Sequence, residues 1–121
     1  MTLAPSDLHK STDEIFADIG RLLMGPELGA LPQPLSALIQ MGQAWLDQRK
    51  MALCEVICRD NRVQAALAHG QLGADFVALV VDIVESSTLR LSPVPPASAG
   101  LLFCRLGYHK LCPKLSAAPP P

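Results

Sequence analysis

A run of apolar residues at helical spacing between residues 35 and 59 dominates the sequence. Its members are Leu35, Leu38, Ile39, Trp45, Leu46, Leu53, Val56 and Ile57. Residues three and four apart share one face of an α-helix, so about six turns of helix bring these side chains together. Pro34 precedes the run and suits the first turn of a helix. This long helix indicates an all-α fold.

A second helix is expected before it, starting near residue 12. Ser11 and Glu14 have the spacing of a capping box, in which each side chain binds the other residue's backbone amide. An apolar stripe follows, and Gly25-Pro26 provides a stop. The stripe consists of Ile15, Phe16, Ile19, Leu22 and Leu23. The spacing therefore predicts a helix from about residue 12 to residue 24.

Two shorter helices are expected after residue 59. Asp60-Asn61 is a plausible cap for a helix over residues 62–68, which would stop at Gly70. Residues 76–85 read FVALVVDIVE and satisfy two patterns. Their β-branched content favours a strand, but their length and continuous apolar character favour a buried helix, with Asp75 as its cap. We therefore predict helix over residues 76–85.

The character of the chain changes after Ser87. Prolines and Gly100 make residues 92–100 a predicted linker, and residues 101–106 form a short apolar piece of undecided type. Residues 116–121 resemble a polyproline tail that has no means of burying itself. The predicted architecture is a small three- to four-helix bundle in residues 1–87, followed by a proline-rich, partly disordered extension in residues 88–121.

Composition excludes several classes of function. A net charge of −1 lacks the basic excess of a nucleic-acid-binding protein, and residues 63–87 contain three acids and no Lys or Arg, the wrong sign for a recognition helix. No apolar run approaches the ~20 residues of a membrane span. Residues 1–10 lack the apolar region of a secretory signal. A soluble, cytoplasmic protein without a nucleic-acid partner is expected.

The four cysteines are then expected to be reduced thiols. Cys54 and Cys58 lie four apart on the long helix, so they share a face with each other. With Cys112 and either Cys104 or His109 they would complete a tetrahedral zinc site. The second pair is more widely spaced than in structural zinc sites, which favours buried cysteines acting as small hydrophobic residues. A disulfide between Cys104 and Cys112 would require an oxidising compartment.

The sequence offers little evidence for a catalytic site. A cysteine nucleophile with His69 or His109 as its base needs an electropositive, partly exposed thiol. Cys54 and Cys58 lie within a helix beside Glu55 instead. The glycines match no phosphate-binding motif, and the clustered acids fit helix ends and solvated faces. We therefore expect no enzyme activity and no cofactor.

Two features are candidate contacts with a partner protein. Trp45 is either a core residue or an interface anchor, because tryptophan is enriched at binding hot spots. The segment LLFCRLGYHKL at residues 101–111 carries Leu102, Phe103 and Tyr108 between basic groups. It would complete the core, contact a partner or touch an anionic membrane surface.

The expected function is therefore that of a non-enzymatic protein–protein interaction module, a small adaptor or accessory subunit of a larger protein. One expectation is that the chain is an accessory component of a larger effector in a bacterial defence system. It rests on the general class of small accessory proteins and not on any motif in the sequence. The alternative is a small zinc-binding or thiol-based protein using Cys54, Cys58, Cys104, His109 and Cys112.

Overall fold

The computed structural model describes residues 10–25 and 33–112. These residues form five α-helices and one short 3-10 helix and contain no strand, so the all-α prediction is confirmed. The elements are α2 (Thr12–Met24), α3 (Leu35–Cys58), α4 (Asn61–Ala68), α5 (Ala74–Ser86), α6 (Pro96–Arg105) and η2 (Tyr108–Leu111). Within the described part of the chain, no helix is both long and apolar enough to cross a membrane.

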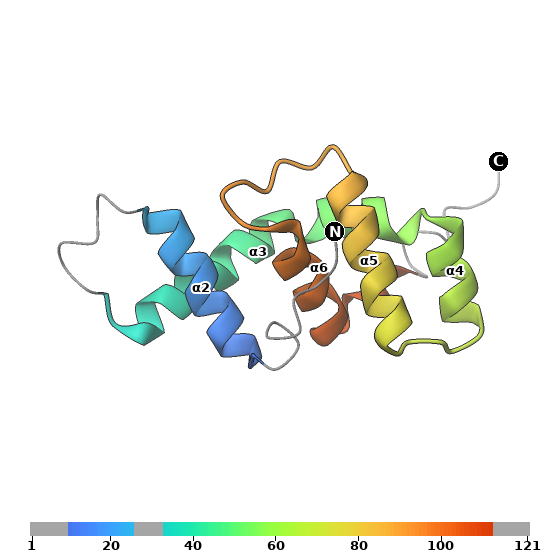
Figure 1. The fold of residues 1–121 in the computed structure, drawn as a ribbon, viewed down its shortest axis with the longest axis horizontal. Coiled ribbons are helices and arrows are strands. Elements are labelled where there is room, and N and C mark those ends of the chain that lie inside the picture. The colour runs from blue at the N-terminus through green and yellow to red at the C-terminus, as the bar shows by residue number, and fades with distance from the viewer. Residues whose placement is uncertain (1–9, 26–32, 113–121) are drawn as a thin grey trace.

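The long helix α3 organises the molecule (Figure 1). Helix α2 packs along the N-terminal half of α3 at one end of an elongated shape, and α4 lies at the other end. Helix α6 lies in the middle and packs against α5. One continuous α-helix therefore connects two packing regions, as the long apolar stripe between residues 35 and 59 predicts.

Two glycines allow α2 and α3 to cross at very short range. A Cβ atom added at Gly20 would lie 2.3 Å from the carbonyl oxygen of Leu38, and one added at Gly42 would lie 2.2 Å from that of Phe16. Gly20 of α2 faces Leu38, which lies four residues before Gly42 on α3. Gly42 in turn faces Phe16, which lies four residues before Gly20 on α2. Only a hydrogen atom fits at either position, so these glycines set the separation of the two helix backbones.

The helix ends follow the local chemistry closely. The capping box of Ser11 and Glu14 is present in both directions, and α2 stops at Gly25 with φ 73°. Asp60 caps α4 by accepting a 2.8 Å hydrogen bond from the backbone N–H of Arg62. Helix α5 confirms the helical prediction for residues 76–85, but its N-cap is Gly73 and not Asp75, which lies in its first turn. The helix therefore begins two residues earlier than predicted, at Ala74.

The main difference from expectation lies in residues 88–112. Leu91, Val94 and helix α6 belong to the same hydrophobic core as α3 and α5, so this stretch completes the fold and does not extend from it. Pro96 occupies the first turn of α6, where a proline costs no hydrogen bond. Gly100 lets α6 approach α5, because a Cβ there would lie 3.1 Å from the Cα of Val81. The proline-rich residues 116–121 lie outside the described residues.

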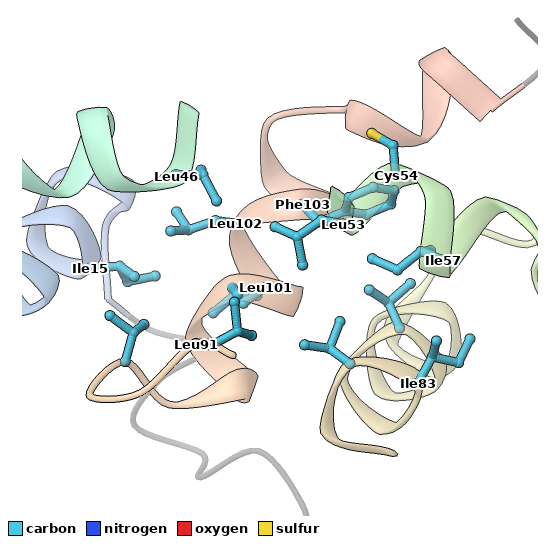
Figure 2. Packing of buried hydrophobic residues seen from close by; sticks show 14 of the residues in the cluster. Ile15, Leu46, Leu53, Cys54, Ile57, Ile83, Leu91, Leu101, Leu102 and Phe103 are labelled. Atoms are coloured by element: carbon cyan, nitrogen blue, oxygen red, sulfur yellow. The ribbon is translucent and has the colours of Figure 1, made fainter. Parts of the chain in front are cut away.

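Side chains from α2, α3, α5 and α6 meet in one hydrophobic core (Figure 2). Leu53, Leu102 and Phe103 are fully buried within it. No polar or charged residue is buried in the described ranges. Apolar burial of this kind is the dominant favourable contribution to folding.

Candidate functional site

The cysteines correct one expectation. Cys58, at the last residue of α3, and Cys112, just after η2, form a disulfide with a Cα–Cα distance of 5.1 Å. The prediction of four reduced thiols is therefore wrong for this pair. The bond joins residues 54 positions apart and fixes the end of η2 to the end of α3. Both cysteines are 2% exposed, so the disulfide is almost fully buried.

The remaining thiols are poorly suited to nucleophilic chemistry. Burial raises the pKa of Cys54, with an opposing effect from Lys50, and burial raises the pKa of Cys104 to about 12. A thiol that stays protonated near neutral pH is a weak nucleophile. These two side chains therefore resemble the small hydrophobic residues expected of buried cysteines.

The zinc arrangement requires sulfurs that the disulfide uses. Among the residues that the structure describes, no group of three or more His, Cys, Asp or Glu side chains is placed to hold a metal ion. His109 lies edge-on to Phe76, with 6.0 Å between ring centroids. Partial burial and the charge of Lys110 lower the pKa of His109. His109 is thus a mainly neutral ring that packs against α5.

Three of the four predicted partner contacts lie in the core. Trp45 is 5% exposed, and Leu102 and Phe103 are fully buried. The guanidinium carbon of Arg49 lies 4.7 Å from the centroid of the Trp45 ring, and Arg49 donates a 3.2 Å hydrogen bond to the Trp45 carbonyl. In this conformation, none of these three side chains presents a surface to a partner.

Tyr108, the fourth candidate, lies where α6 turns into η2. Gly107 adopts the left-handed conformation (φ 71°, ψ 27°) and reverses the chain there. The Tyr108 ring meets Phe103 edge-on, with 6.0 Å between centroids, and the Lys50 ammonium lies 4.8 Å from its ring centroid. Partial burial, followed by the nearby charge of Asp47, raises the pKa of Tyr108. The ring therefore contacts both Phe103 of α6 and Lys50 of α3, and its hydroxyl stays protonated near neutral pH.

Beside Tyr108 an open groove of about 460 Å³ runs along α3, and we call it the α3–η2 groove. Its lining residues are Phe16, Gln40, Gln43, Ala44, Leu46, Asp47, Leu106 and Tyr108. Leu106 stands at its edge with 40% of its surface exposed, although it follows directly on the buried core of α6. Its lining combines apolar and aromatic side chains with two amides and one carboxylate. Protein interfaces likewise combine apolar contacts with polar groups.

A second open groove of about 610 Å³ lies between α4 and α5, and we call it the α4–α5 groove. It is lined by Arg62, Ala65, Ala66, Gln71, Gly73, Ala74, Asp75, Phe76 and Leu79. Leu72, in the loop between the two helices, is 43% exposed. Helix α4 has Val63 as its buried residue, so most of this short helix faces solvent.

Of the contact candidates predicted from the sequence, Tyr108 lines the α3–η2 groove, whereas Leu106 and the two grooves were not predicted. The segment at residues 101–111 carries six apolar side chains besides Cys104, and spacing alone does not tell which of them enter the core. The available signal was Gly107, whose left-handed conformation ends α6 and separates the buried Leu101–Phe103 from the residues that follow. Comparisons with protein families, curated proteins and solved structures find no match to this chain.

Proposed function

We propose that this chain is a non-enzymatic protein-interaction module, an adaptor or accessory subunit, that binds a larger protein through the α3–η2 groove. The observation that carries the proposal is the exposed Leu106 beside Tyr108 on a turn held at both ends. Buried α6 holds one end of this turn and the Cys58–Cys112 disulfide holds the other. A surface already held in one conformation loses little conformational freedom on binding, which favours affinity.

The chemistry of the groove supports a protein partner. Tyrosine contributes a large, rigid contact area and a hydrogen-bonding hydroxyl, which makes it frequent at binding hot spots. Gln40, Gln43 and Asp47 supply donors and acceptors along the α3 side. A partner segment with one or two apolar side chains and nearby hydrogen-bonding groups would match this pattern.

The test is native mass spectrometry of tagged protein purified from its own host. We expect a second polypeptide to accompany the wild-type chain and the Leu106→Glu variant to lose it by at least on the order of tenfold, because a buried charge would replace an apolar contact. Met51→Glu is the matched control, since Met51 is 53% exposed on α3 and lies outside both grooves. This control should retain the partner.

Equal loss in both variants, or a wild-type chain that carries no partner, would contradict the proposal. The same spectra examine the zinc alternative. One zinc per chain in the native spectrum, together with the two hydrogens that a disulfide-free chain carries once acid has removed the metal, would favour a metal site instead. An accessory role in a bacterial defence system stays a prediction. The identity of the accompanying polypeptide would test it.

A further inference from the structure

We infer that the α4–α5 groove is a second docking surface, which accepts a basic amphipathic helix of another protein. This inference does not depend on the α3–η2 groove. It uses other helices and another end of the molecule, since α4 and α2 lie at opposite ends in Figure 1. An adaptor with two such surfaces could connect two partners.

The small residues that line the groove favour a helix as its occupant. Four of its nine lining residues are alanine or glycine, contributed by α4, by the connecting loop and by α5. Small side chains between two helices let a third helix approach closely, and a helix in a groove is a recurring mode of peptide recognition. Phe76 and Leu79 supply apolar contact inside the groove, and the exposed Leu72 adds apolar surface in the adjacent loop.

The charges around the groove favour a basic occupant. Residues 63–87 contain no Lys or Arg, and their acids are Asp75, Asp82 and Glu85. Asp75 lines the groove and Asp82 is exposed on the same helix, seven residues further along and therefore on the same face. Glu85 follows at a half-buried position. Helix α5 thus places Asp75 in the groove and Asp82 on the same face of the helix, and the cation in the groove lining is Arg62.

The positive charge of Arg62, which lines the groove, is paired with the carboxylate of Asp60. Arg62 donates side-chain hydrogen bonds of 3.1 Å and 3.0 Å to the two carboxylate oxygens of Asp60. This contact is the main reason that the pKa of Arg62 is raised, and Asp82 contributes further. Arg62 therefore does not repel a basic partner. Lysines or arginines beside an apolar stripe would complement Asp75 and Asp82 and speed encounter.

The probe is a designed helical peptide of about 18 residues, long enough to hold helical structure, with leucine on one face and lysine on the other. Its control has glutamate in place of lysine. Using the full-length oxidised protein, we expect one-to-one binding of the leucine–lysine peptide and slower amide exchange across residues 62–79. The leucine–glutamate peptide should bind more weakly by at least on the order of tenfold, because charge complementarity is lost.

Matched variants test the two parts of the argument. Neutralising Asp75, Asp82 and Glu85 to Asn, Asn and Gln should weaken peptide binding on the order of tenfold, as three weak ion pairs would allow. Neutralising Asp13, Glu14 and Glu55, which line neither groove, to Asn, Gln and Gln alters net charge equally and should change binding less than about twofold. Ala65→Gln should fill the groove and weaken binding, whereas Ala68→Gln, outside the lining on the same helix, should not.

Several results would overturn the inference. They are an absence of binding, equal binding of both peptides, protection outside residues 62–79, or equal effects of the two charge-neutralised variants. Self-association that protects residues 62–79 would assign the groove to a second copy of this chain and would also overturn it. None of these results bears on the Leu106→Glu experiment, so the failure of one proposal is distinguishable from the failure of the other.

Discussion

At the scale of single residues, the close crossing of α2 and α3 depends on two glycines, which have no side chain. Gly20 and Gly42 are each opposed by a backbone carbonyl of the other helix, so neither neighbour is a flexible side-chain end that could rotate away. A methyl group at either position would separate α2 from α3 or bend one of them. The sequence showed both glycines within helices but carried no sign of this contact.

We expect Gly20→Ala and Gly42→Ala each to lower the free energy of unfolding by about 3 kcal/mol, even though alanine is the better helix former. Urea unfolding followed by circular dichroism measures the change. Gly73→Ala is the control, because a Cβ at Gly73 meets nothing within 4 Å, and it should cost less than about 1 kcal/mol. Equal costs at all three positions would show that the close crossing does not determine stability.

The cysteines show a second limit of residue-level reasoning. Spacing placed Cys54 and Cys58 on one helical face, and the structure confirms that both are buried on α3. The partner of Cys58 is Cys112, because α4, α5 and α6 return the chain to the end of α3. That proximity is a property of the whole fold, and no local pattern predicts it.

At the scale of elements, helix prediction succeeded where periodicity and end signals agreed. α2 and α3 have long apolar stripes and defined ends, and α5 was long enough for helix to outweigh its β-branched content. Helix α6 was missed because Pro95, Pro96 and Gly100 are typical of linkers. Here the prolines begin a helix and the glycine admits a neighbouring helix. These roles depend on tertiary contacts.

Phe103→Ala tests whether α6 belongs to the core. The Phe103 side chain is fully buried, so its removal should lower the free energy of unfolding by about 4 kcal/mol. Leu106→Ala, one turn later and 40% exposed, should cost less than about 1 kcal/mol. Thermal or urea unfolding of both variants gives the comparison. A small effect of Phe103→Ala would indicate that residues 88–112 extend from the fold and do not complete its core.

Helix α4 should depend on its cap. Asp60→Ala removes the acceptor for the Arg62 backbone N–H and should destabilise the protein by about 1 kcal/mol at pH 7. The hydrogen bonds from Arg62 lower the pKa of Asp60 below its usual 3.8. A lowered folded-state pKa contributes stability above the unfolded value, and that contribution is lost as pH falls through the folded value.

The difference in stability between wild type and Asp60→Ala should therefore be constant from pH 7 to about pH 5 and shrink at lower pH. Urea unfolding at a series of pH values measures it. Asp60→Asn, which keeps the acceptor oxygen but removes the charge, should lose less than Asp60→Ala and show little pH dependence. A difference that grows on acidification would contradict the assigned role of Asp60.

At the scale of the whole molecule, the disulfide closes a loop that contains α4, α5, α6 and η2. Loop closure restricts the unfolded chain, and for a loop of this size the chain-entropy relation gives about 4 kcal/mol of stabilisation. That amount is a large share of the 5–15 kcal/mol that is typical of single domains. The bond also holds η2, and with it Tyr108, against α3. Stability and the shape of the α3–η2 groove therefore depend on one covalent link.

Reduction of the protein, or the Cys112→Ser variant, should lower the free energy of unfolding by about 4 kcal/mol and speed amide exchange of residues 107–112 before that of α3. Urea unfolding with and without dithiothreitol measures the first effect, and exchange followed by mass spectrometry measures the second. Dithiothreitol should leave the stability of Cys112→Ser unchanged, because its Cys58 then has no disulfide to lose. If reduction alters neither stability nor exchange in the wild type, the link does not hold η2 in place, and the α3–η2 groove would then persist without it.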